Sequence, residues 1–250
     1  MTAPPDGPAV TIGVSPEHPA LQGRTGLGVL VAVIDSGVHA DHPHVEGVLG
    51  GVAIEEDGSQ HGDYVDRLGH GTAVTAAIKE KAPETDIYAI KVFGRTLSTS
   101  TGVLVRAIDL AIERGARLIN LSLGTAKTEH ELTLWAAVDR ARKEGAVVVS
   151  PKAHEGRYWL PGSLEGAGGV VLDWGCPRDQ LRVVCLEGQE PAFVASGFPR
   201  PISGVSPERN LKGVSFAAAN TTGILARLVQ ERPELRSVGD IVALLKNSAG

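Results

Sequence analysis

Residues 29–34 form an unbroken run of six apolar residues that ends at Asp35. A run without alternation of apolar and polar residues is typical of a strand that is buried on both faces, as the central strands of a parallel sheet are. A carboxylate that directly follows such a strand emerges at its carboxyl end, where open α/β sheets place their functional sites. The run therefore predicts a central parallel strand with Asp35 at the functional edge of the sheet.

Strand-like and helix-like segments alternate through the following part of the chain. Apolar runs predict further strands at residues 86–92, 118–122 and 147–149. Helical periodicity predicts intervening helices at residues 101–114 and 132–144. This alternation predicts an α/β fold with three layers, in which a doubly wound, mainly parallel sheet carries helices on both faces. Residues 170–212 break the rhythm with short strands and loops rich in glycine and proline, which indicates an antiparallel edge.

The length of 250 residues and the hydrophobic content of 42% suit one domain with one substantial core. Residues 1–24 hold five of the fifteen prolines and show little periodicity, so we expect an irregular N-terminal arm there. Residues 25–250 are expected to form the single globular domain.

The net charge of −5 and the pI near 5.9 argue against nucleic acid or an anionic membrane surface as the main partner. No stretch reaches the roughly 20 apolar residues of a membrane span, and the first residues lack the basic and apolar regions of a signal peptide. We therefore expect a cytoplasmic protein.

The two cysteines are Cys176 and Cys185. Residues 170–174 and 181–186 are interpreted as the two strands of a hairpin that turns near Arg178. In that register the two cysteines lie at different distances from the turn, which disfavours a bridge between them. Free thiols, as in a reducing compartment, are the expectation.

Two further motifs supply a candidate base and a candidate nucleophile. His70 lies between two glycines and precedes a helix-forming stretch, so we expect it in the first turn of a helix. Ser215 opens a second helical stretch, at residues 216–229, whose amino-terminal end favours negative charge. Because a serine hydroxyl needs an imidazole to take its proton and a carboxylate to orient that imidazole, Asp35, His70 and Ser215 predict a catalytic triad. Each residue alone also has a structural alternative: a helix cap for Asp35 or Ser215 and a packing role for His70.

The triad motifs read Val-Ala-Val-Ile-Asp-Ser-Gly at residues 31–37, Gly-His-Gly-Thr at 69–72 and Gly-Val-Ser-Phe-Ala-Ala at 213–218. Their order and flanking residues resemble the subtilisin-like serine proteases, the subtilases of peptidase family S8. The resemblance extends from about residue 26 to residue 226. It implies a serine endopeptidase with a subtilisin-like fold that acts through an acyl-enzyme and needs no cofactor.

The resemblance also implies a substrate cleft. Residues 119–124, Ile-Asn-Leu-Ser-Leu-Gly, are similar to the family's strand at the edge of the cleft. An extended peptide could pair with this edge through its backbone. The implied substrate-binding residues are Leu68, Ser122, Leu123, Gly124, Thr125, Pro151, Lys152 and Ala153. Leu68 would lie beside the second side-chain pocket of the cleft. Pro151, Lys152 and Ala153 would line the primary side-chain pocket. Lys152 would favour an acidic or polar substrate group there, or else be a solvated surface lysine.

The oxyanion position departs from the family pattern. The family carries Gly-Asn-Glu-Gly, whereas this chain has Ala153-His154-Glu155-Gly156. The resemblance therefore implies His154 as the side-chain donor to the oxyanion, together with the backbone amide of Ser215. A histidine keeps an N–H in either tautomer, so it can serve as this donor. The alternative is a rearranged loop in which His154 packs or faces solvent.

Three histidines, His39, His42 and His44, match no common zinc spacing, and His44 stands where many family members have an acidic calcium ligand. We therefore expect no metal.

The leading functional hypothesis is an intracellular endopeptidase with a restricted polypeptide substrate, such as a precursor leader. One alternative is a transpeptidase or macrocyclase with the same triad. The other is a catalytically silent scaffold that binds a peptide. The sequence leaves the oligomeric state open.

Overall fold

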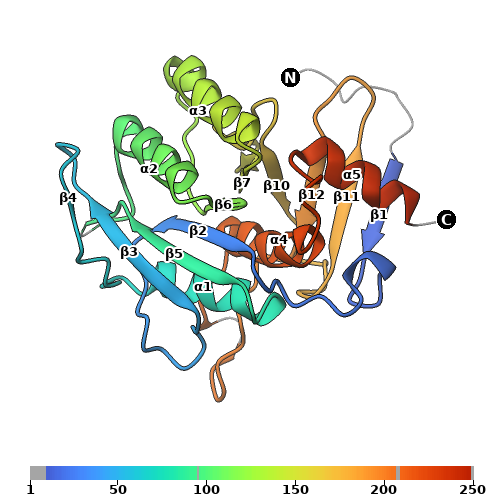
Figure 1. Cartoon of the computed structure of the whole chain (residues 1–250), viewed down its shortest axis with the longest axis horizontal. Coiled ribbons are helices and arrows are strands. Elements are labelled where there is room, and N and C mark those ends of the chain that lie inside the picture. Colours follow the sequence, from blue (N-terminus) through green and yellow to red (C-terminus); the bar gives the residue numbers. More distant parts are fainter. Residues whose placement is uncertain (1–9, 95, 207–208, 249–250) are drawn as a thin grey trace.

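The computed structural model describes residues 10–94, 96–206 and 209–248, and for His154 it describes the backbone only. Within this part of the chain, ten strands form one sheet in the order β1-β11-β12-β10-β7-β6-β2-β5-β3-β4 (Figure 1). The strands are β1 (Val10–Val14), β2 (Leu30–Asp35), β3 (Val48–Ile54), β4 (Gln60–His61), β5 (Asp86–Lys91), β6 (Leu118–Leu121), β7 (Val147–Pro151), β10 (Gly168–Leu172), β11 (Leu181–Cys185) and β12 (Ala192–Ala195).

The sheet is parallel from β12 across to β3, while β11, β1 and β4 are antiparallel to their neighbours. The helices are α1 (His70–Lys81), α2 (Thr101–Glu113), α3 (Glu131–Lys143), α4 (Val214–Val229) and α5 (Val238–Asn247), with short 3₁₀ turns at Pro19–Leu21 and Thr128–His130. The prediction of a doubly wound, mainly parallel sheet with helices on both faces is confirmed.

The alternation of side chains along β2 determines which face carries the candidate site. Val31 and Val33 pack into the core formed with α1, α4 and α5, whereas Ala32 and Ile34 pack into the core formed with α2 and α3 (Figure 1). Successive residues of a strand point to opposite faces. Asp35, two residues beyond Val33, therefore falls on the face that α1 and α4 cover. Those two helices begin with the His70 and Ser215 motifs.

The N-terminal arm is more regular than expected. β1 pairs with β11, and Ile12 and Val14 are 6% and 1% exposed. The 3₁₀ turn that follows buries Ala20 and Leu21. The prediction of an irregular arm is therefore wrong for this part, because two alternating apolar residues are enough to anchor an edge strand once a partner strand is present. Residues 1–9 lie outside the described residues.

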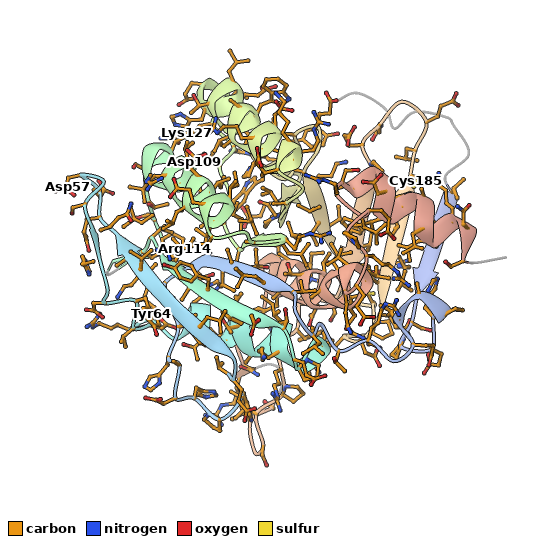
Figure 2. The ribbon with its side chains drawn as sticks, viewed as in Figure 1. Asp57, Tyr64, Asp109, Arg114, Lys127 and Cys185 are labelled. Atoms are coloured by element: carbon orange, nitrogen blue, oxygen red, sulfur yellow. The ribbon has the colours of Figure 1, made fainter. Side chains whose placement is uncertain are left out.

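The predicted hairpin between residues 170–174 and 181–186 is also wrong. β12 lies between β10 and β11, parallel to β10 and antiparallel to β11, so the two predicted partners never pair. Cys176 and Cys185 are nevertheless both free thiols; the Cys176 sulfur is buried, and Cys185 lies on β11, as labelled in Figure 2. Burial raises the pKa of the Cys176 thiol.

No helix within the described ranges is both long and apolar enough to cross a bilayer.

Candidate active site

Asp35 and His70 form a hydrogen-bonded pair at the carboxyl end of β2, an inner strand of the sheet. His70 Nδ1 lies 2.7 Å from Asp35 Oδ1, and the backbone N–H of Ser36 donates to the same oxygen over 2.7 Å. Asp35 is fully buried and the His70 side chain is 14% exposed. Because the carboxylate accepts from Nδ1, it fixes the imidazole tautomer that leaves Nε2 free to accept a proton.

Two glycines allow the start of α1 to approach the end of β2. A Cβ atom on Gly71 would lie 2.1 Å from the Gly37 carbonyl oxygen and 3.1 Å from Asp35 Cβ. Gly37 has a φ of +100°, and a Cβ there would lie 2.3 Å from the carbonyl oxygen of Tyr64, a residue labelled in Figure 2. Any side chain at either position would separate His70 from Asp35. This close contact is the physical reason for the glycine after Ser36 and the glycine after His70.

Ser215 is the second residue of α4, and it lies close to His70. The Phe216 ring contacts the His70 ring with centroids 5.8 Å apart. The Ser215 hydroxyl donates to the backbone carbonyl of Ser122 over 3.0 Å. Proton transfer to the imidazole requires the hydroxyl to leave this hydrogen bond, and we expect rotation about the Cα–Cβ bond to release it. The amide of Ser215 is in the first turn of the helix, where backbone N–H groups have no intrahelical acceptor.

A buried polar chain anchors α4 beneath the nucleophile. Asn120, which is fully buried on β6, donates from Nδ2 to Ser122 Oγ over 2.9 Å and accepts from Thr222 Oγ1 over 2.9 Å. Thr222 is two turns along α4 from Ser215. These bonds hold the helix against β6, so that Ser215 stays beside the Ser122 carbonyl.

Asp66 is a site residue that the sequence analysis missed. It is 8% exposed, and its carboxylate accepts five hydrogen bonds within 2.7–2.9 Å. The donors are the Ser36 hydroxyl, the Thr72 hydroxyl and the backbone amides of Leu68, Gly69 and Thr72. An aspartate two to three residues before a glycine at a helix start is an Asx-turn signal, and this signal was available in the sequence.

Two carboxylates set the charge state of His70. Burial lowers the pKa of the imidazole, but the hydrogen bond that His70 donates to Asp35 and the negative charges of Asp35 and Asp66 outweigh it, so the pKa is above its ordinary 6.5. Asp66 itself remains charged because, although burial raises its pKa, its hydrogen bonds bring the net value below the ordinary range. A general base must be neutral to accept a proton, so activity is expected to rise with pH through the raised pKa of His70.

Replacing Asp66 with asparagine should move that titration to lower pH. The substitution removes one negative charge near His70, so the imidazolium is less stable and the pKa of His70 is lower. The midpoint of the kcat/KM profile should therefore fall by up to about one pH unit. Profiles measured between pH 5 and 9 check this prediction. Asp63→Asn is the matched control, because Asp63 is in the same loop but is exposed and paired with Arg67 at 2.8 Å. An unchanged midpoint in a folded Asp66→Asn protein would contradict it.

The predicted substrate edge follows β6 directly. Thr125 exchanges two backbone hydrogen bonds with Leu160, over 2.9 and 2.8 Å, and the Leu123 carbonyl accepts from Ser150 Oγ over 3.2 Å. Leu68 precedes the His70 turn and is 39% exposed. The structure thus places Ser122, Leu123, Gly124 and Leu68 close to the triad elements, while Thr125 is already paired.

Residues 151–153 form a second segment beside this edge, at the end of β7. The Lys152 ammonium does not face the Ser122–Gly124 edge. Its ammonium donates to the backbone carbonyl of Glu190 over 2.9 Å, next to β12, which lies on the other side of β7 from β6. Burial lowers the pKa of Lys152. The structure corrects the prediction that Lys152 meets an acidic substrate group, because its charge is directed away from the cleft edge.

His154 belongs to a small hairpin formed by β8 (Ala153–His154) and β9 (Arg157–Tyr158). Glu155 and Gly156 have φ values of +49° and +75°, as a two-residue hairpin turn with positive φ at both positions requires. The side chain of His154 lies outside the described residues, and its donor role stays a prediction. Among the described residues, no cluster of three or more His, Cys, Asp or Glu is placed to hold a metal.

Comparison with known proteins gives a consistent family. Residues 26–151 match the model of the subtilase family, peptidase S8. The chain is 30% identical to subtilisin E of Bacillus subtilis (strain 168) over 86% of this chain and 58% of that protein. It is 30% identical to the subtilisin of Bacillus pumilus over 86% of this chain and 80% of that protein. The identity to a thermostable alkaline protease of Halalkalibacterium halodurans is 31%, over 84% and 59% of the two chains.

Solved structures show the same fold. A cold-adapted subtilisin-like serine proteinase matches with a TM-score of 0.68 and 21% identity, covering 90% of this chain and 83% of that one. A protease of Pseudoalteromonas arctica PAMC 21717 matches with a TM-score of 0.70 and 20% identity, covering 92% and 86%. The chain spans 58% and 59% of the length of two of the curated relatives and 80% of a third. The family model over half of the chain, with the relatives at 30% identity, shows that this chain belongs to the subtilase family.

Proposed function

We propose that this chain is a serine endopeptidase that hydrolyses polypeptides through an acyl-enzyme on Ser215. The observation that carries the proposal is the 2.7 Å bond between buried Asp35 and His70 Nδ1, with Ser215 at the adjacent helix start. This arrangement leaves His70 Nε2 as the base for the serine hydroxyl.

The reaction then follows from the positions of these groups. His70 Nε2 takes the Ser215 proton as Oγ bonds to the carbonyl carbon of the peptide. The Ser215 amide, in the first turn of α4, is a donor to the oxyanion that forms. His70 then gives its proton to the leaving amine, the C–N bond breaks, and water, deprotonated by His70, hydrolyses the remaining ester.

The second oxyanion donor is proposed to be His154. Its backbone is held in β8, and a protonated or neutral imidazole supplies an N–H. Removing an oxyanion donor in subtilisin, a relative of this chain, lowers turnover by about 10²–10³. We expect His154→Ala to lose a comparable factor and His154→Asn to retain more activity, measured as turnover between pH 5 and 9. Equal turnover in the wild-type and His154→Ala proteins would contradict the donor role.

The substrate is proposed to be a restricted set of polypeptides, such as precursors with a leader segment, cut in the cytoplasm. Two free cysteines support a reducing compartment. The Ser122–Gly124 edge supports backbone pairing with an extended peptide, because strand addition satisfies main-chain groups whatever the side chains.

The test combines an alkyl fluorophosphonate with peptides of defined sequence. A serine endopeptidase gives one covalent adduct, on the peptide that contains Ser215, and hydrolysed fragments in mass spectra. Products with the mass of a ligated or cyclised peptide would show a transpeptidase instead. A folded protein without adduct or fragments would be the catalytically silent scaffold, and the proposal would fail.

A further inference from the structure

Trp159 lies between the two segments that flank the candidate cleft. Its backbone N–H donates to the Lys152 carbonyl over 2.9 Å, and the next residue, Leu160, pairs with Thr125. The chain therefore crosses from one segment to the other at this residue. The side chain of residue 159 therefore lies close to both segments.

The indole of Trp159 lies directly against Gly124. A Cβ atom built on Gly124 would be 2.7 Å from Trp159 Cε3 and 3.4 Å from Cδ2, and it would be 2.8 Å from the Leu160 carbonyl oxygen. Real Cβ atoms do not approach heavy atoms so closely, so the ring occupies the place that a side chain at position 124 would take. Trp159 is only partly buried, so part of the residue remains accessible to solvent.

The two segments are also held together close to Trp159. Ser150 Oγ donates to the Leu123 carbonyl over 3.2 Å and joins the two segments at their strand ends. A Cβ on Gly162 would lie 2.1 Å from the Pro151 carbonyl oxygen and 2.5 Å from the Ser150 carbonyl oxygen, so the chain packs tightly there. The indole therefore packs on Gly124 beside a part of the chain that has no room for further side chains.

The position of the nucleophile determines which substrate side chain comes closest to Trp159. Ser215 Oγ lies 3.0 Å from the Ser122 carbonyl, so a carbonyl carbon attacked by Ser215 must lie beside Ser122. We expect a peptide paired with the Ser122–Gly124 edge to direct the side chain of its attacked residue between this edge and residues 151–153. That side chain would meet the indole.

We propose that Trp159 is a specificity-determining residue that fills the primary side-chain pocket and restricts the attacked residue to glycine, alanine or serine. The inference rests on the proposed endopeptidase function and adds the substrate class. A bulky side chain would have to displace a large aromatic ring that is packed on a backbone, and overpacking of this kind is costly.

The test is a series of peptides that differ only at the attacked residue, with Gly, Ala, Leu or Phe there. Wild-type kcat/KM should be about 10²-fold higher for Ala than for Phe, since pocket size discriminates by factors of this order. Trp159→Gly should raise kcat/KM for the Phe peptide by about 10²-fold and change the Gly peptide little. Trp159→Leu should give an intermediate selectivity. Tyr158→Gly is the matched control, because Tyr158 is the preceding aromatic residue and is 74% exposed.

A fluorophosphonate with a small alkyl group separates this inference from the proposed function. If the wild-type protein forms the Ser215 adduct but cleaves the Phe peptide as efficiently as the Ala peptide, the inference is wrong and the function stands. If no adduct forms on any folded variant, the proposed function fails and the inference with it. A Trp159→Leu protein that is folded and labelled, yet as selective as wild type, would also overturn the inference.

Discussion

The Ser215→Ala protein is expected to hydrolyse peptides about 10⁶-fold more slowly than the wild type. This magnitude comes from subtilisin and is carried over to its relative. Without Oγ no acyl-enzyme can form, and water must attack the peptide with help only from the Ser215 amide and the bound geometry. Such residual assistance corresponds to about 10³–10⁴ over the uncatalysed reaction. Turnover of a fluorogenic peptide and labelling by a fluorophosphonate are the measurements.

The control for this variant is another serine replaced in the same way. Ser203 is exposed in the loop that precedes α4, so Ser203→Ala should keep both turnover and labelling. Ser215 donates to the Ser122 carbonyl, and its loss removes one hydrogen bond, which costs only about 1 kcal/mol of stability. The variant should therefore remain folded. Labelling of a folded Ser215→Ala protein would show that another residue is the nucleophile.

The elements that present the triad could be predicted because their signals are local. The apolar run before Asp35 became β2, and the helices expected at residues 101–114 and 132–144 became α2 and α3 with ends shifted by one residue. Side chains two residues apart on a strand point to the same face, so Asp35 lies on the same face of β2 as Val31 and Val33. This is the face on which α1 and α4 begin. In this part of the chain, local pattern and tertiary arrangement agree.

The antiparallel edge expected within residues 170–212 is present, but its strand order could not be predicted, because strand order depends on long-range pairing. Nothing near residues 170–186 indicates that β12, which comes later in the chain, lies between β10 and β11. The same reason explains β1, whose partner is about 170 residues away in sequence. A hairpin between strands that are adjacent in sequence is therefore the wrong pairing for β10 and β11.

Long-range contacts also determine where single side chains of the candidate cleft lie, and the sequence does not show these contacts. The position of Lys152 in the chain predicts a place in the primary pocket, but its ammonium donates to the Glu190 carbonyl near β12. No sequence signal marks Trp159, because its position depends on Gly124, 35 residues earlier, which leaves room for the ring. A residue's neighbourhood in space, rather than its place in a motif, decides what a substrate would meet.

The Asp35→Ala protein is expected to lose about 10⁴-fold in kcat, a magnitude that again comes from subtilisin. Removing the carboxylate leaves Nδ1 of His70 without its acceptor, so the ring can rotate and adopt the tautomer in which Nε2 carries the proton. The hydrogen bond and the charge that raise the pKa of His70 are lost as well. The pH midpoint of the residual activity should therefore fall. Asp41→Ala, an exposed acid in the loop after β2, should change neither quantity.

Asp35→Asn separates orientation from charge. The Ser36 N–H donates to Asp35 Oδ1, so it favours the amide rotamer that keeps an oxygen at this position. That rotamer still accepts from His70 Nδ1 and maintains the tautomer, but it places the amide nitrogen where Oδ2 is buried without a hydrogen-bond partner. We therefore expect Asp35→Asn to retain more turnover than Asp35→Ala while its pH midpoint falls similarly, since both variants lack the negative charge. Equal turnover of the two variants would show that the charge of Asp35, rather than its orienting hydrogen bond, accounts for its role.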